Sequence, residues 1–138
     1  MSFSNDNEKT PRIAVDAIIR IGDCIVLIKR GNPPFQGHYA LPGGFVEIGE
    51  FLEEAVVREA REETGLDVQV ERLLGVYDDP KRDPRGHVIS IVYICKVIGG
   101  ALRAGSDAKD VNCVPVKEIR KIKLAFDHEK ILKDAGII

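Results

Sequence analysis

Two apolar runs near the N-terminus have the composition of β-strands. They cover residues 12–20 (RIAVDAIIR) and 24–29 (CIVLIK), and Gly22-Asp23 between them predicts a tight hairpin turn. The following segment, residues 31–44, contains three prolines and four glycines. Such a composition predicts a long loop, and its aromatic and apolar residues favour an ordered one.

Residues 50–64 (EFLEEAVVREAREET) give the clearest helical pattern in the chain. They are rich in Glu, Ala, Arg and Leu, they contain no Gly or Pro, and Gly65 follows as a C-cap. The elements predicted after the helix are strands at 67–77, 87–98 and 111–116, loops at 78–86 and 99–109, and a helix at 127–135 with Asp127 as its N-cap. This order predicts a mixed β-sheet with helices packed on it, an α/β or α+β fold.

Composition limits the class of protein. The chain has 138 residues, 44% hydrophobic and 30% charged, with a net charge of −2. We expect one domain over residues 1–138, in which the polar residues 1–10 are flexible. The near balance of charge speaks against a basic nucleic-acid-binding surface. No apolar run reaches the roughly 20 residues that span a bilayer, and the start of the chain has no secretory signal.

Three widely spaced cysteines point to a reducing compartment. Cys24, Cys95 and Cys113 each lie in apolar sequence, and none is part of a C-x-x-C pair. We interpret them as small buried hydrophobic residues rather than metal ligands. With the polar N-terminus, this predicts a cytoplasmic protein with no membrane partner.

The 50–64 helix carries carboxylates on an unexpected face. At about 100° per residue, an apolar stripe in its first half is continued in its second half by Glu59, Glu62 and Glu63. Carboxylates at i,i+3 and i,i+4 spacing lie side by side, and they repel one another unless they are protonated or neutralised. Oxygen ligands of this kind suit Mg²⁺ or Mn²⁺. The alternative is a solvated face on which Arg58 pairs with Glu54 and Glu62.

The sequence around the helix extends this pattern. Gly44 is followed by five residues, Glu50, seven residues and then REAREETGL at 58–66. This stretch resembles the Nudix box, Gly-x5-Glu-x7-Arg-Glu-U-x-Glu-Glu-x-Gly-U, in which U is a bulky aliphatic residue. Every fixed position matches, and only Ala60 is smaller than the usual residue at its aliphatic position. The resemblance predicts a Nudix-type α/β/α sandwich with a mixed β-sheet.

The resemblance also implies a chemistry. Nudix enzymes hydrolyse a nucleoside diphosphate linked to another group and use divalent cations. In this chain the implied Mg²⁺ (or Mn²⁺) ligands are Glu59, Glu62 and Glu63, and Gly44 lets the loop backbone approach the metal and the phosphates. Arg58 would orient the carboxylates. The general base stays open between Glu59 and a carboxylate of a later loop, Asp107 or Asp110.

Three further segments resemble the ADP-ribose pyrophosphatase branch of this family, at residues 32–44, 78–87 and 124–128. The implied reaction is cleavage of ADP-ribose to AMP and ribose 5-phosphate, and such domains often form homodimers. Two alternatives remain. One is a house-cleaning hydrolase of normal or oxidised nucleoside triphosphates, and the other is an ADP-ribose-binding sensor that does not cleave.

Candidate substrate contacts lie in these segments or, for Arg30, just ahead of the first one. Arg82 and Arg85 have guanidinium groups suited to phosphate or ribose hydroxyls, and Arg30 could reach a phosphate. The alternative for the first two is pairing with Asp79 and Asp83. Phe35 and Tyr39 are candidates to stack on adenine, for which buried packing is the competing role.

Overall fold

The computed structural model describes residues 10–105 and 108–138, and the expectations for residues 1–9 and for Asp107 lie outside this range. The strands are β1 (Arg12–Ile21), β2 (Cys24–Arg30), β3 (Tyr39–Ala40), β4 (Gly43–Phe45), β5 (Leu66–Tyr77), β6 (Val88–Gly100) and β7 (Ala108–Pro115). The helices are α1 (Leu52–Thr64), the 3₁₀ helix η1 (Val116–Lys121) and α2 (His128–Asp134).

A mixed sheet forms the centre of the molecule. Its main path runs β3-β2-β1-β6-β5, while β4 pairs with β1 and β7 pairs with β2. Strands β1 and β6 are parallel, and the pairs β1–β2 and β5–β6 are antiparallel. The predicted hairpin is therefore confirmed.

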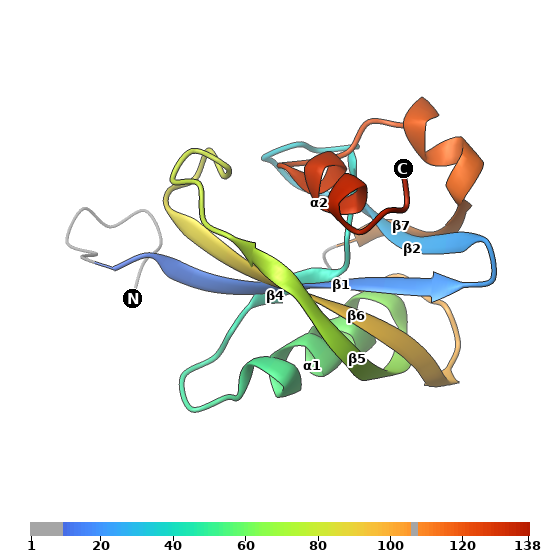
Figure 1. The fold of residues 1–138 in the computed structure, drawn as a ribbon, viewed down its shortest axis with the longest axis horizontal. Helices are drawn as coiled ribbons and strands as arrows, with labels where there is room; N and C mark the ends of the chain where they lie inside the picture. The colour runs from blue at the N-terminus through green and yellow to red at the C-terminus, as the bar shows by residue number, and fades with distance from the viewer. Residues whose placement is uncertain (1–9, 106–107) are drawn as a thin grey trace.

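Helices cover both faces of this sheet, α1 on one side and α2 on the other (Figure 1). The alternation of β1 explains the two layers, because neighbouring side chains of a strand point to opposite faces. Val15, Ala17 and Ile19 belong to the core under α1, whereas Ile18 belongs to the core under α2. The α/β/α sandwich is thus confirmed. Within the described residues, no helix is long and apolar enough to cross a membrane.

The segment 31–44 differs from the predicted continuous loop, because it contains β3 and the first two residues of β4. Tyr39 and Ala40 pair with β2, and Gly43 to Phe45 pair with β1. Strands of two or three residues have too little periodicity to be recognised in a sequence, and they exist here because longer neighbours supply their hydrogen bonds. The 3₁₀ helix η1 was not predicted either, because a helix of six residues is also too short to show a clear periodicity in the sequence.

The ends of the helices also refine the prediction. Helix α1 begins at Leu52 rather than at residue 50, and the Phe51 N–H donates to the Glu54 carboxylate at 2.8 Å. Asp127 stands at the N-cap position of α2, but it makes no side-chain capping hydrogen bond. Gly65 is the C-cap of α1 as expected, with a φ of 78° and its N–H bonded to the Arg61 carbonyl. A Cβ at Gly65 would overlap the Ala101 carbonyl and lie 2.7 Å from Cγ of Arg103.

This crowding predicts a large effect of Gly65→Ala on stability. Gly136 has a similar φ of 74° but no atom within 4 Å of an added Cβ, so Gly136→Ala is a matched control for the backbone term alone. We expect Gly136→Ala to lower the free energy of unfolding by about 1 kcal/mol, and Gly65→Ala to lower it by at least about 1 kcal/mol more. Urea unfolding of both variants measures the difference, and equal losses would contradict the role of the close contact.

Candidate functional site

A cleft of about 350 Å³ opens at one end of the sheet, where residues of the Nudix-like stretch meet the later loops. Strand β1 contributes Ala14 and Asp16 to its wall, β4 contributes its three residues, and α1 contributes Glu59 and Glu63. The remaining lining residues come from β2, β3, β6, α2 and the loops: Ile28, Arg30, Asn32, Pro33, Ala40, Leu41, Arg82, Asp83, Arg85, Val88, Phe126 and His128. The cleft therefore brings together chain segments that are far apart in sequence.

Gly44 allows α1 to approach the sheet closely. It pairs with Val15 of β1, and a Cβ at this position would lie 2.5 Å from the carboxyl carbon of Glu59. Any side chain would therefore displace the Glu59 carboxylate. The contact explains in physical terms why the predicted site needs a glycine here, since only glycine leaves room for a carboxylate against the backbone.

Arg58 ties this carboxylate to the turn before the helix. Its guanidinium donates to both oxygens of Glu50, at 2.7 and 3.0 Å, and to the Phe45 carbonyl at 3.1 Å. It also donates to Glu59 at 2.7 Å and to Glu62 at 3.2 Å. Its pairing with Glu62 agrees with the solvated-face alternative, but Glu54 is not its partner. The network joins β4, the preceding turn and α1 through one side chain.

The charges in this network shift the pKa values of its members. Hydrogen bonds from Arg58 and the Glu47 backbone lower the pKa of Glu50 from 4.5 to about 2. Hydrogen bonding with Glu50 raises the pKa of Arg58. Burial raises the pKa of Glu59, although the contact with Arg58 opposes it. Glu59 is therefore a desolvated carboxylate whose charged form a cation would favour.

The residues here suit a divalent cation. Glu59 and Glu63 line the cleft, and Oε2 of Glu63 is buried. Glu62 is directed toward Arg58 instead, with 58% of its side chain exposed. Among the residues that the structure describes, no three acidic, His or Cys side chains are grouped closely enough to hold an ion in their present positions. The donors are nonetheless all oxygens, as Mg²⁺ and Mn²⁺ prefer, and Glu62 lies one helical turn from Glu59.

The arginines suggested as substrate contacts all line the cleft, but two are held by carboxylates. Arg82 makes a bidentate ion pair with Asp127, at 2.6 and 2.9 Å, and only 4% of its side chain is exposed. Arg85 pairs with Asp83, as the alternative interpretation has it, whereas the guanidinium of Arg82 pairs with Asp127 and not with the carboxylate of Asp79. The Arg82 pair also explains why the Asp127 carboxylate does not cap α2.

Other candidates lie away from the cleft wall. Phe35 packs edge-on against Phe126, with ring centroids 4.9 Å apart, and Tyr39 lies in β3 with the Lys29 ammonium 5.7 Å from its ring centroid. Asp110 is an exposed residue of β7, and its carboxylate accepts the N–H of Val111. None of these three predicted residues lines the cleft. The aromatic rings that do are Phe45 and Phe126.

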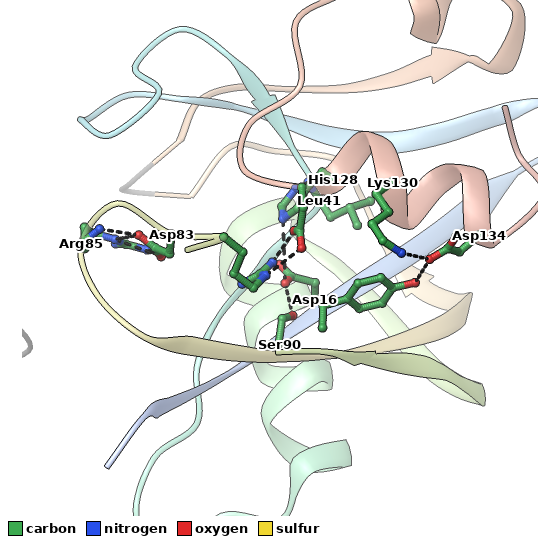
Figure 2. Close-up of polar contacts among 11 residues, drawn as sticks. Asp16, Leu41, Asp83, Arg85, Ser90, His128, Lys130 and Asp134 are labelled. Carbon is green, nitrogen blue, oxygen red and sulfur yellow. Dashed lines mark hydrogen bonds and ion pairs between the residues drawn. The ribbon is translucent and has the colours of Figure 1, made fainter. Parts of the chain in front are cut away.

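The structure also contains a buried polar cluster that was not predicted from the sequence. Asp16 accepts a hydrogen bond from the Ser90 hydroxyl, and its carboxylate lies 4.0 Å from Nε2 of His128 (Figure 2). Nδ1 of His128 accepts the N–H of Leu41 at 3.0 Å. Burial lowers the pKa of His128. The available signal was the charged residue within the otherwise apolar core of RIAVDAIIR.

The sequence of this chain is similar to those of known proteins. The ADP-ribose pyrophosphatase of Methanocaldococcus jannaschii is 62% identical over 124 residues, which are 90% of this chain and 72% of that protein. The ADPR responsive transcriptional repressor NtrR of Acinetobacter baylyi is 32% identical over 140 residues, and the match covers 96% of this chain but only 56% of the repressor.

The fold is also similar to solved structures. The NUDIX domain of Shewanella oneidensis NrtR, in complex with ADP ribose, superimposes with a TM-score of 0.82 at 27% identity, over 94% of this chain and 88% of that one. The family model described as NUDIX domain matches residues 10–135. Because this match spans nearly the whole chain, the protein belongs to the Nudix family.

Proposed function

We propose that this protein is a divalent-cation-dependent pyrophosphatase that hydrolyses ADP-ribose to AMP and ribose 5-phosphate. One observation carries the proposal: Glu59 and Glu63 of α1 line the same cleft as Gly43 and Gly44. The 62% identity to an ADP-ribose pyrophosphatase supports the choice of substrate.

The cation-binding residues in this proposal are Glu59, Glu62, Glu63 and the backbone at Gly44. A bound Mg²⁺ or Mn²⁺ would neutralise diphosphate charge and make a water molecule more acidic. The protein holds the carboxylate oxygens in position for the cation. Arg58 fixes the Glu59 and Glu62 carboxylates by its hydrogen bonds, and the missing side chain at Gly44 keeps the approach open.

The substrate contacts are assigned to the remainder of the cleft. Arg30 and Arg85 would face the diphosphate or its sugars from the wall they line. Arg82, which is bound by Asp127, would act by shaping the floor. Phe35 would support Phe126 from behind rather than stack on the base itself. Tyr39 would likewise stabilise the wall, because it lies in β3 next to the lining residue Ala40.

The general base remains a choice between two positions. Glu59 is the first, because it is buried beside the proposed cation site and its pKa is raised by that burial. The second is a carboxylate of Asp107 or Asp110, and the structure places Asp110 in β7. Asp110 would have to reach the cleft from the exposed side of β7.

The proposal places the protein in the cytoplasm and includes a homodimer. The three cysteines are free thiols, which is typical of a reducing compartment. Sedimentation equilibrium of the purified chain tests the dimer.

A substrate panel tests the function. ADP-ribose, dGTP, 8-oxo-dGTP and diadenosine polyphosphates are each incubated with Mg²⁺ or with EDTA, and the products are separated by ion-exchange chromatography. We expect AMP and ribose 5-phosphate from ADP-ribose, at the highest kcat/KM of the panel and only with Mg²⁺. Faster cleavage of the triphosphates would favour the house-cleaning alternative. Binding of ADP-ribose without release of AMP would favour the sensor, to which the ADPR responsive repressor lends support.

The pairing of Glu50 with Arg58 predicts a pH dependence of stability. Because the pKa of Glu50 falls from 4.5 to about 2 in the folded protein, the unfolded chain takes up a proton at this residue before the folded one does. The stabilisation is fully present above pH 4.5 and is lost as the pH falls toward 2.

Urea unfolding of the wild type and of Glu50→Gln measures this effect. We expect Glu50→Gln to be less stable than the wild type at pH 7 and the difference to shrink as the pH is lowered from 4.5 to 2.5. Glu53→Gln, at an exposed position in the first turn of α1, is the matched control and should show little difference at any pH. A pH-independent gap for Glu50→Gln would show that the ion pair does not contribute.

A further inference from the structure

Asp16 is a carboxylate in an unusual place. It lies in the middle of the central strand β1, between the fully buried residues Val15 and Ala17, and is itself only 8% exposed. It nevertheless lines the cleft. Burying a carboxylate costs free energy unless its charge is compensated, so a hydrophobic residue at this position would serve the core better. The position of Asp16 calls for a role in the cleft.

Ser90 and His128 face the carboxylate of Asp16, and of these two only Ser90 hydrogen-bonds to it. Ser90 donates its hydroxyl to Oδ2 of Asp16. Because Nδ1 of His128 accepts the Leu41 N–H, the proton of the neutral ring is on Nε2, which faces Asp16 at 4.0 Å. Burial lowers the pKa of His128 and so favours this neutral ring. Figure 2 shows Asp16 between Ser90 and His128.

Two of the three arginines that line the cleft are engaged with other carboxylates. Arg82 is held by Asp127 through two hydrogen bonds, and Arg85 is held by Asp83. In the described part of the chain, His128 is the only basic group within 4.0 Å of the Asp16 carboxylate, and the guanidinium of Arg82 interacts with Asp16 electrostatically from a greater distance. Among the described residues, Ser90 is the one side chain that hydrogen-bonds to the carboxylate of Asp16, and a carboxylate can accept more hydrogen bonds than this one.

Asp16 also lies next to the proposed position of the diphosphate. A Cβ at Gly43 would overlap Oδ1 of Asp16, and the adjacent Gly44 is the residue that contacts the Glu59 carboxylate. A diphosphate bound at Gly44 and Glu59, as the proposed function requires, would thus place its next substituent close to Asp16. In a sugar-linked diphosphate that substituent is a ribose with hydroxyl donors, whereas in a nucleoside triphosphate it is a third phosphate.

We propose that Asp16 is a specificity-determining residue that accepts a hydrogen bond from a ribose hydroxyl and repels a third phosphate. This inference rests on the proposed function for the position of the diphosphate. It is consistent with the pairing of Arg82 with Asp127 and of Arg85 with Asp83, because carboxylates of the protein already engage these two guanidinium groups. A hydrogen bond to a charged acceptor and a like-charge repulsion act in the same direction, so both favour ADP-ribose over ATP.

Equilibrium binding tests this inference separately from catalysis. Dissociation constants of ADP-ribose and ATP are measured by calorimetry in EDTA for the wild type, Asp16→Asn and Asp16→Ser. Asp23→Asn is the matched control, because it removes one carboxylate from the exposed hairpin turn, where the Asp23 side chain is 98% exposed. Circular dichroism establishes that each variant is folded, and the smaller Asp16→Ser variant carries the test if the amide is not accommodated.

We expect the preference for ADP-ribose over ATP to fall by about 10- to 100-fold in the Asp16 variants and to stay unchanged in Asp23→Asn. The ratio of kcat/KM for the two ligands with Mg²⁺ should move in parallel. A merely structural role of Asp16 would weaken the binding of ADP-ribose and of ATP equally. An unchanged ratio of the two dissociation constants in folded Asp16 variants would therefore overturn the inference. If the proposed function itself is wrong, the result is different: the wild type releases no AMP from ADP-ribose in the presence of Mg²⁺.

Discussion

The hydrogen bonds of Arg58 are the contact on which the arrangement of the cleft depends. One guanidinium group joins the turn at Glu50, the carbonyl of Phe45 in β4 and the carboxylates of Glu59 and Glu62. Three structural segments are therefore held in register by a single side chain that is 24% exposed. Because removing one partner of a partly buried ion pair leaves a charge uncompensated, the network favours one arrangement of these segments.

The cleft is organised as two regions with different chemistry. At the α1 side, the Glu59 carboxylate lies against the backbone of Gly44 and Glu63 lines the same cleft, which favours a cation and the phosphates that it neutralises. On the floor, Asp16, Ser90 and His128 form a buried polar cluster. The first region would serve any member of a family that cleaves diphosphates. The second region differs in kind, since it can discriminate between the groups attached to the diphosphate.

Local sequence predicted the parts of this structure that local forces determine. The helix of residues 52–64, its glycine C-cap and the spacing of its glutamates depend on neighbours within a few residues, and all could be found without the structure. The partners of Arg82 and Asp16 could not. Asp127 lies 45 residues from Arg82, and His128 is even further from Asp16, so only the folded sheet brings them together. The strands β3 and β4 are likewise formed by pairing with β2 and β1 rather than by their own propensity.

The central claim is that the carboxylates of α1 form a cation site held by Arg58 and Gly44. The most direct test is a titration of the protein with Mn²⁺, followed by electron paramagnetic resonance, for the wild type, Glu63→Gln and the exposed control Glu53→Gln. The account predicts that the wild type and Glu53→Gln bind Mn²⁺ alike and that Glu63→Gln binds it at least about tenfold more weakly. Equal Mn²⁺ affinity in all three proteins would contradict it.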